Sequence, residues 1–234
     1  MIDRLSTAIL FVSLFLGTGL VSCSSEEKPQ ETMEGRDTTP VADTSSRSAS
    51  GDNLPNELQT WFGDRYGPAV GTVKYEVTIG ETTTGRTSYF ADHGLREAHY
   101  LNLTEEKNAP QHITIIDSGK IIAMGPGDPK PLRATWHPDP NQTLPNFRHL
   151  TDDMRELFRL EELPSKEILG KESRGYRLQI GNSISDVWVW EGIMLYSEIK
   201  GGEGVTMPPM TIRAISVDTS SRPGKAYFTI AGSN

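Results

Sequence analysis

The amino-acid sequence predicts a mostly β domain of the α+β class, with antiparallel strands and one main helix packed on their sheet. Several segments alternate apolar and polar residues with a period of two, which is typical of half-buried strands. Short runs rich in Gly, Asn and Asp separate these segments, as expected for hairpin turns. A single capped segment has helical periodicity, and it supplies the α part of the prediction.

The chain opens with an uncharged apolar run, Leu5–Leu20, that is followed closely by Cys23, the only cysteine. A run of about 15 apolar residues is short for a membrane span, which needs roughly 20, but it suits the apolar part of a secretory signal. The ending Leu20-Val21-Ser22-Cys23 resembles the bacterial lipoprotein signal. This resemblance implies that residues 1–22 are a signal peptide and that the Cys23 thiol is acylated. The alternative is a buried, chemically idle cysteine after an apolar segment.

Acylation of Cys23 would attach the chain to a lipid bilayer, at about 0.8 kcal/mol per buried methylene group. The lipoprotein resemblance implies three acyl chains, which form a lasting anchor. Ser24 and Ser25 follow the cysteine. In lipoproteins an Asp directly after the cysteine commonly retains the protein in the inner membrane, so its absence favours the outer membrane. We therefore expect an exported protein of the cell envelope.

Residues 23–53 comprise the acylated cysteine and a polar, acidic stretch without an aromatic residue. Such a composition cannot bury enough apolar surface to offset the entropy lost on ordering, so it predicts a disordered tether. The tether is either a spacer that lifts the domain off the bilayer or a leader of no particular length.

The net charge of −8 is shared between the tether and the domain. Residues 24–53 carry seven acidic and three basic side chains, and the signal carries one of each, so the remainder also contributes −4. A mildly acidic domain without a basic stripe argues against a nucleic-acid partner.

Residues 54–234 are expected to form a single β-rich domain that begins with a short helix or turn around Leu58, Trp61 and Phe62. Roughly eight to ten strands follow. We expect them at 73–79, 86–90, 97–103, 112–116, 120–124, 176–180, 187–190, 194–200, 210–217 and 227–230.

Between these strands lies Gly125–Pro145, whose six prolines predict a long irregular loop over most of its length. Long loops inside compact domains are usually functional or mobile. Trp136 and His137 lie within this loop.

The main helix is predicted at Thr151–Leu163. Thr151 can cap its N-terminus, the acidic residues that follow suit the positive end of the helix dipole, and Pro164 ends it. Its apolar residues form one stripe, which we expect to pack on the sheet.

No catalytic constellation is visible in the sequence. The five histidines lack the spacing of zinc ligands, and there is no Gly-x-Ser-x-Gly nucleophile motif. We therefore expect a protein that is not an enzyme and that needs no cofactor or metal. A structure that brought a histidine and a carboxylate together in a cleft would reopen this question.

The aromatic residues are the stronger functional signal. The segment Val187-Trp188-Val189-Trp190 is apolar on both faces, so it is either covered on both sides or lines an apolar cavity. These aromatic residues either pack in an ordinary solid core or line a cavity for an acyl chain. The residues predicted to line such a cavity are Trp188, Trp190, Met154 and Phe158.

The order of the elements also suggests a family. A hairpin at IIDSGKIIAM, a helix, and then GKESRGYRLQI, VWVWEGIMLYSEIK, MTIRAISV and AYFTI together resemble the periplasmic lipoprotein-carrier class of LolA- and LolB-like proteins. The resemblance implies a curved antiparallel sheet or incomplete barrel that wraps a helical lid and holds acyl chains.

The function expected from the sequence is that of a membrane-anchored envelope lipoprotein that binds an apolar ligand, acyl or lipid, in a half-barrel cavity. The alternative is a structural or protein-interaction module with a solid core, which would use the loop Gly125–Pro145 as its binding surface.

Overall fold

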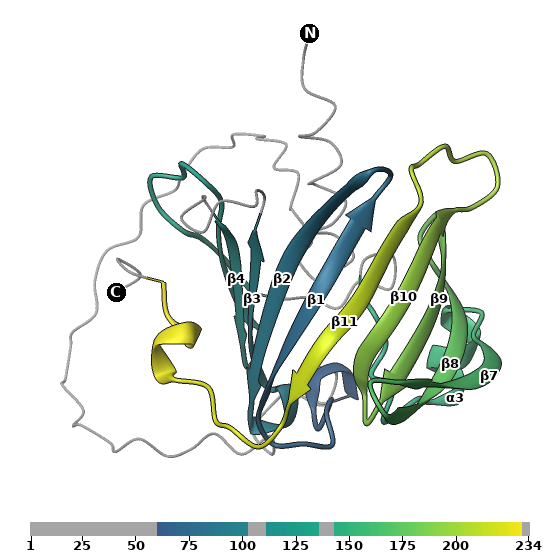
Figure 1. The fold of residues 1–234 in the computed structure, drawn as a ribbon, viewed down its shortest axis with the longest axis horizontal. Helices are drawn as coiled ribbons and strands as arrows, with labels where there is room; N and C mark the ends of the chain where they lie inside the picture. Colours follow the sequence, from purple (N-terminus) through teal and green to yellow (C-terminus); the bar gives the residue numbers. More distant parts are fainter. Residues whose placement is uncertain (1–59, 103–110, 136–142, 231–234) are drawn as a thin grey trace, which may run out of the picture.

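The structure is a computed structural model of the 234-residue chain, and it describes residues 60–102, 111–135 and 143–230. Eleven strands form one antiparallel sheet in the order β6-β5-β4-β3-β2-β1-β11-β10-β9-β8-β7 (Figure 1). The chain enters the middle of the sheet at β1 (Gly71–Ile79) and runs outward to one edge at β6 (Leu132–Thr135). It then crosses to the other edge at β7 (Glu161–Ile168) and returns to the middle at β11 (Met210–Asp218), which pairs with β1.

The described residues thus confirm the mostly β prediction, in the form of one large open antiparallel sheet. The remaining strands are β2 (Thr82–Ala91), β3 (Arg96–Asn102), β4 (Gln111–Asp117), β5 (Lys120–Met124), β8 (Lys171–Ile180), β9 (Ser183–Trp190) and β10 (Ile193–Gly201). The helical elements with assigned bounds are α3 (Asp152–Leu157) and two 3-10 turns, η2 (Asp92–Gly94) and η3 (Lys225–Phe228).

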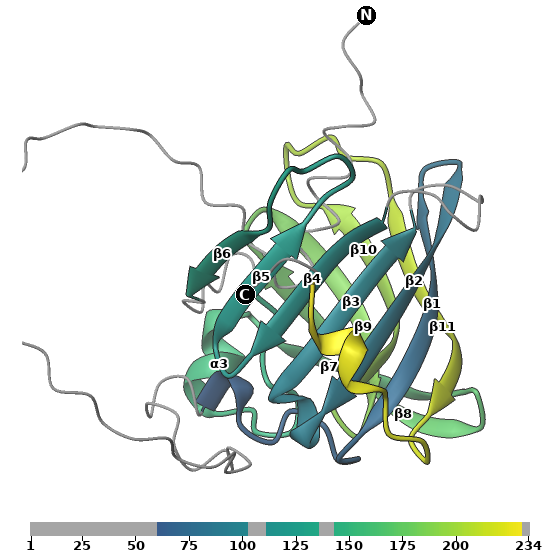
Figure 2. The same cartoon turned by 90° about the vertical axis from the view of Figure 1, so that its left-hand side faces the viewer.

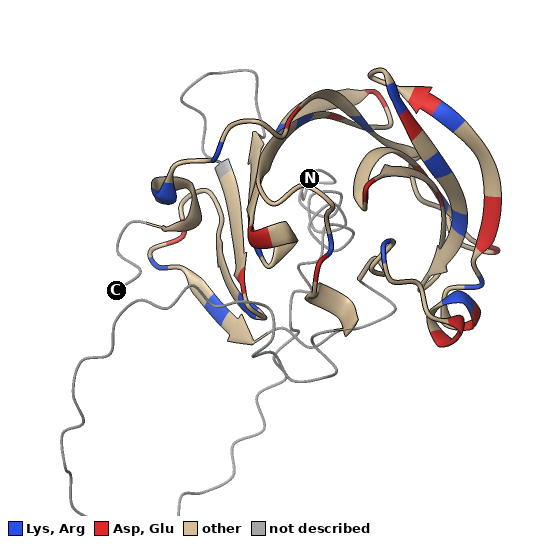
Figure 3. Ribbon diagram, turned by 90° about the horizontal axis from the view of Figure 1, so that it is seen from below, with Lys and Arg blue, Asp and Glu red and all other residues tan. Residues whose placement is uncertain are grey.

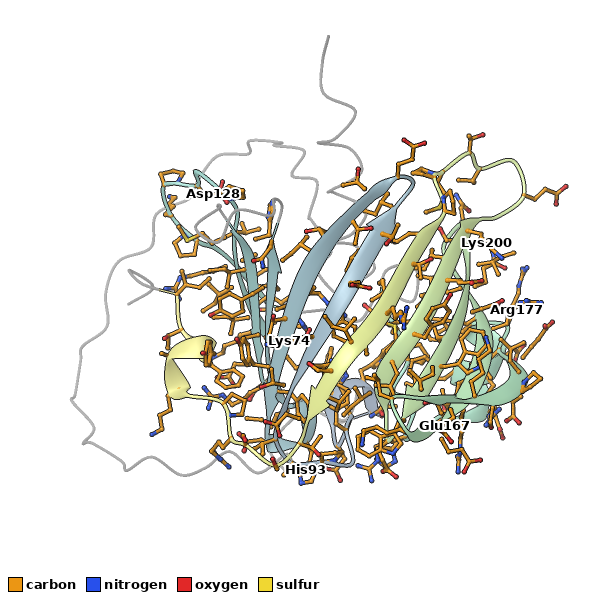
Figure 4. All side chains as sticks on the ribbon, viewed as in Figure 1. Lys74, His93, Asp128, Glu167, Arg177 and Lys200 are labelled. Carbon is orange, nitrogen blue, oxygen red and sulfur yellow. The ribbon has the colours of Figure 1, made fainter. Side chains whose placement is uncertain are left out.

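The strands follow the predicted alternation where one face is buried. In β1 the side chains of Val73, Tyr75 and Val77 are buried, whereas Lys74 and Glu76 between them are exposed. Figure 4 labels Lys74 on this strand.

Tight turns join the neighbouring strands. Ser118 and Gly119 have φ values of 51° and 81°, and Glu191 and Gly192 have 49° and 81°. Two successive positive φ values are typical of the type I′ turn, whose twist suits a two-residue hairpin.

The sheet is strongly curved (Figure 3). We call the face that carries Val77, Leu178 and Ile212 the inner face, because these residues belong to the largest buried apolar cluster. Helix α3 packs against this cluster. Residues 143–150 also pack against it, and we call them the cover segment. The opposite side of the sheet is the outer face.

The outer face of the β2–β5 arm is covered by η3 (Figure 2). The ring of Tyr227 stacks on that of Tyr89, with centroids 4.0 Å apart. The Tyr100 hydroxyl donates a hydrogen bond to the Tyr227 carbonyl at 3.0 Å. The strand predicted at 227–230 was therefore wrong, because this segment packs its ring on the sheet instead of pairing with a strand.

The main helix is shorter than predicted. Thr151 does cap it, since its hydroxyl accepts a hydrogen bond from the Met154 N–H at 3.2 Å. The helix ends at Leu157, and Arg159 adopts a left-handed conformation with φ of 47°. The prediction of one main helix over Thr151–Leu163 was therefore wrong in extent.

The residues expected to complete this helix form the edge strand β7 instead. Pro164 lies inside β7, where a residue without an N–H is tolerated because an edge strand bonds on one side only. The pairing with β8 shifts register between Leu163 and Lys166, which flank this proline.

The stretch 125–145 is also less irregular than predicted, because β6 lies within it and pairs with β5. Trp136 and His137 lie outside the described residues, as do Leu58, Cys23 and the whole tether. Within the ranges that the structure describes, no helix is long and apolar enough to cross a membrane.

Candidate functional site

Polar side chains gather on the inner face where β2 pairs with β3. Arg86 and Ser88 lie two residues apart on β2, and Glu97 and His99 lie two residues apart on β3, so each pair points to one face. Ser88 is directly opposite His99 in the ladder. Arg86, Ser88 and Glu97 are 4%, 7% and 2% exposed. Buried polar side chains need hydrogen-bond partners, and most members of this cluster have one.

Glu97 is the centre of the cluster. Arg65, from the segment before β1, donates to Glu97 Oε1 at 2.6 Å. The Tyr66 hydroxyl and His99 Nε2 each lie 3.1 Å from Glu97 Oε2. Burial alone would raise the pKa of the Glu97 carboxyl, but Arg65, His99 and Tyr66 together hold that pKa below its usual value. Glu97 is therefore a buried carboxylate that contacts three polar side chains.

His99 links this carboxylate to a hydroxyl. Its Nδ1 lies 2.9 Å from Ser88 Oγ. Because a carboxylate only accepts hydrogen bonds, the neutral imidazole carries its proton on Nε2 and accepts the Ser88 hydroxyl proton at Nδ1. The result is a chain of hydrogen bonds from Ser88 through His99 to Glu97. It brings a histidine and a carboxylate together, which is the condition that reopens the question of an enzyme.

Arg86 differs from Arg65 because it forms no ion pair with a carboxylate of the described residues. Its guanidinium carbon lies 4.1 Å from the centre of the Tyr75 ring. Its Nε and Nη1 are buried and make no hydrogen bond with the residues that the structure describes. Burial lowers the pKa of this guanidinium.

These polar groups line a cavity of about 70 Å³ on the inner face. Apolar side chains form much of the remaining wall: Val73, Phe90, Leu144, Phe147, Ile193 and Met194. Ligand pockets commonly measure about 300–1,000 Å³, so this cavity in its present form admits only a small group.

The cover segment forms one wall of the cavity and is held by side chains. Asn146, 1% exposed, donates from Nδ2 to the Gly63 carbonyl at 2.8 Å. Arg148 donates from Nη1 to the carbonyls of Asp64 and Tyr66 at 3.2 and 3.1 Å. Phe147 stacks on Tyr176 with ring centroids 5.5 Å apart. The segment contains no helix or strand, so few bonds fix it in place.

The carbonyl groups that bind the cover segment belong to residues 63–66, and this stretch is itself attached to the sheet. Nδ1 of His93 lies 3.1 and 3.0 Å from the carbonyls of Tyr66 and Gly67. The Gly67 N–H donates to the Glu191 carbonyl at 2.9 Å. Figure 4 shows His93 at the lower end of the sheet.

None of the four residues predicted to line an apolar cavity lines this one. Met154 and Phe158 are 4% and 0% exposed and lie in the core between α3 and the inner face. Phe158 packs edge-to-face on Trp61 at 5.9 Å. These two residues hold α3 on the sheet.

Alternation along β9 turns Trp188 and Trp190 away from Val187 and Val189, which are buried in the inner-face cluster, although Trp190 also packs against that cluster. Trp188 lies on the outer face, where its indole N–H donates to the Pro164 carbonyl at 3.0 Å and Lys166 Nζ lies 3.4 Å from its ring centroid. Trp190 is partly buried beneath Lys171, whose Nζ lies 3.6 Å from its ring centroid. A lysine ammonium group thus lies over each ring.

Sequence reasoning missed the polar cluster because its members come from separate elements. One signal was present: two residues spaced Glu-x-His on a predicted strand, Glu97 and His99, must share a face. Among the described residues, no group of three or more His, Cys, Asp or Glu side chains is placed to hold a metal ion.

The fold and the cavity define an open antiparallel sheet with a partly polar site on its inner face. No protein-family model and no curated protein matches the chain. Solved structures do match. The MucA/MucB complex of Pseudomonas aeruginosa is 9% identical, with a TM-score of 0.48, over 79% of this chain and 62% of that chain.

A LolA superfamily protein from Nitrosomonas europaea is 10% identical, with a TM-score of 0.33, over 77% of this chain and 97% of that chain. A DUF1329 family protein from Desulfovibrio piger is also 10% identical, with a TM-score of 0.34, over 70% and 90% of the two chains. The chain thus spans about three fifths of the MucB-complex chain. All three TM-scores are below 0.5, so the proposals below rest on the geometry of this chain.

Proposed function

We propose that this protein is a lipid-anchored, non-enzymatic module of the bacterial envelope that binds an acyl-bearing ligand between the inner face and the cover segment. The motif Leu20-Val21-Ser22-Cys23 supports the anchor, and the Ser24 and Ser25 that follow it support an outer membrane location. The observation that carries the ligand is the cavity, because apolar side chains from β1, β2, β10 and the cover segment converge on it.

An acyl chain enters this site when the cover segment moves. The cavity of about 70 Å³ is well below the roughly 300–1,000 Å³ of common ligand pockets, which is too little for a long chain. Segments with few backbone hydrogen bonds open locally at low cost. The cover segment is of this kind, since side chains of Asn146 and Arg148 make most of its hydrogen bonds. Each Å² of apolar surface that the ligand buries then contributes about 25 cal/mol.

Ligand binding is tested on the full chain extracted gently from membranes. We expect native mass spectrometry to detect a co-purified lipid and a fluorescent fatty acid to bind saturably. Met194→Trp, which fills the cavity, should weaken that binding at least tenfold. Tyr196→Trp is the matched control on the outer face of the same strand and should leave it within twofold. Absence of both co-purified lipid and saturable binding would favour a structural or protein-interaction module.

A second candidate function follows from Ser88, His99 and Glu97. Their hydrogen bonds of 2.9 and 3.1 Å have the order of a nucleophile, a general base and an orienting carboxylate in the wall of the cavity. In ester hydrolysis Ser88 Oγ would attack the carbonyl carbon while its proton passes to His99 Nδ1 and then to the leaving alcohol. Water would then cleave the acyl-serine and release the acid.

We place this candidate second because Glu97 is shared. Arg65 and Tyr66 also bind its carboxylate, which weakens its hold on the imidazole. Hydrolysis of p-nitrophenyl butyrate by the full chain decides the matter. Activity lost in Ser88→Ala but kept in Ser173→Ala, a buried serine of β8, would establish the enzyme; equal background rates in all three proteins would exclude it.

A further inference from the structure

The two arginines that line the cavity have different surroundings. Arg65 is bound to the Glu97 carboxylate at 2.6 Å. Arg86 has no ion pair with a described residue, and its Nε and Nη1 have no hydrogen-bond partner among them. Among the residues that line the cavity Glu97 is the one carboxylate, and its single charge is already paired with Arg65. Arg86 is therefore a buried cation without its own counter-ion.

A buried guanidinium remains charged, because arginine does not lose its proton in proteins. An isolated buried charge is strongly disfavoured unless something neutralises it. Tyr75 contacts the guanidinium with its ring and carries no charge, and its hydroxyl donates to the Met194 carbonyl at 3.0 Å. The charged side chains that line the cavity, Arg65, Arg86 and Glu97, sum to one excess positive charge. The site is thus complementary to one anion.

The surroundings of Arg86 also limit the chemistry of that anion. The cavity next to it, about 70 Å³, suits a head group with a few oxygen atoms. Phe90, Phe147 and Met194 line the same cavity and suit an apolar continuation of the ligand. Arginine donors bind carboxylate and phosphate oxygens with short, charge-assisted hydrogen bonds.

We infer that Arg86 binds the anionic head group, a carboxylate or a phosphate, of an acidic amphiphile whose chain lies under the cover segment. This inference rests on the proposed function, since it names the ligand class of the same cavity. It adds a specificity that apolar burial alone does not supply: a neutral amphiphile of equal chain length leaves the buried charge of Arg86 unpaired.

The test compares three ligands of equal chain length on the full chain in a non-ionic detergent, with native mass spectrometry to measure the bound fraction. The ligands are tetradecanoic acid, tetradecyl phosphate and tetradecanol. We expect at least one acidic ligand to bind about tenfold or more tightly than the alcohol, since hydrogen bonds to charged groups are strong. Preference between the two acids identifies the head group as a carboxylate or a phosphate.

Variants then assign the preference to Arg86. Arg86→Gln should lower the affinity for the acidic ligand at least tenfold and leave that for tetradecanol within twofold. Arg86→Lys keeps the charge and should retain a preference for the acid. Arg177→Gln is the matched control, because Arg177 is an exposed arginine of the outer face that pairs with Asp186 (Figure 4).

The outcomes separate the two ideas. Equal binding of acids and alcohol by the unmodified chain, or an acid preference that survives Arg86→Gln, overturns the inference while ligand binding stands. If none of the three ligands binds, the proposed function fails and the inference fails with it. The comparison in the unmodified chain needs no variant, so a folding defect in Arg86→Gln cannot hide the answer.

Discussion

The guanidinium of Arg86 lies 4.1 Å from the centre of the Tyr75 ring, on the strand that pairs with its own. This contact offsets part of the cost of burying the charge, and its contribution is small. A desolvated cation–π contact contributes about 2 kcal/mol, whereas burying an ion costs several kcal/mol even after relaxation. We therefore expect Arg86 to destabilise the protein when no ligand is bound.

The first prediction follows from this imbalance. Arg86→Met has a similar volume and no charge, and it should raise the free energy of unfolding of the ligand-free protein by about 1–3 kcal/mol. Urea denaturation measures the change. Arg65→Met is the comparison. It leaves the buried Glu97 carboxylate without its arginine partner and should lower the free energy of unfolding by about 3–5 kcal/mol. A loss of stability in Arg86→Met would mean that Arg86 is structural.

Acid sensitivity centred on Glu97 is the second prediction. The pKa of its carboxyl is held below the ordinary value of 4.5. The unfolded chain therefore binds the proton more readily, so Glu97 stabilises the fold at neutral pH and loses this contribution as the pH falls through the folded-state pKa. Unfolding free energies measured from about pH 7 down to pH 3 should fall less steeply in Glu97→Gln. Parallel profiles for the two proteins would contradict the assignment.

The third prediction concerns how α3 is held. Phe158, fully buried against Trp61 and the inner face, should cost about 3–5 kcal/mol of unfolding free energy when replaced by Ala. Leu157, its neighbour in the sequence, is 52% exposed, and Leu157→Ala should cost under about 1 kcal/mol. Similar losses in both variants would show that the helix packs differently.

Fourth, the turn at Gly192 should resist any side chain. A Cβ there would collide with the Arg65 carbonyl, and its φ of 81° already disfavours other residues. Gly170 has a φ of 69° with open space around it, so Gly170→Ala isolates the conformational cost of about 1–2 kcal/mol. Gly192→Ala should lose clearly more in a thermal melt. Equal losses would mean that the segment around Arg65 moves aside freely.

The sequence predicts most strands because local patterns determine them. The alternation in β1 and the Ser118–Gly119 and Glu191–Gly192 turns need no information from elsewhere in the chain. Edge strand β7 was missed for the opposite reason. Its exposed residues show no alternation, and Pro164 argues for a break, yet pairing with β8 draws the segment into the sheet.

The site was harder to predict than the fold, because it depends on contacts between distant residues. Arg65 meets Glu97 only because the segment before β1 lies across the inner face. The tryptophans show the same dependence on the fold. Their size suggested a cavity lining, but the parity of β9 places Trp188 on the outer face under Lys166.

The order of strands has a consequence for folding kinetics. Each arm is a series of hairpins between neighbours in the sequence, whereas β1 and β11 join residues more than a hundred positions apart, such as Ile79 and Met210. Closing so long a loop is slow, so we expect the seam between these strands to form after both arms. Until then, two nine-residue strand edges remain unpaired in the middle of the sheet. Aggregation during folding should therefore begin at this seam.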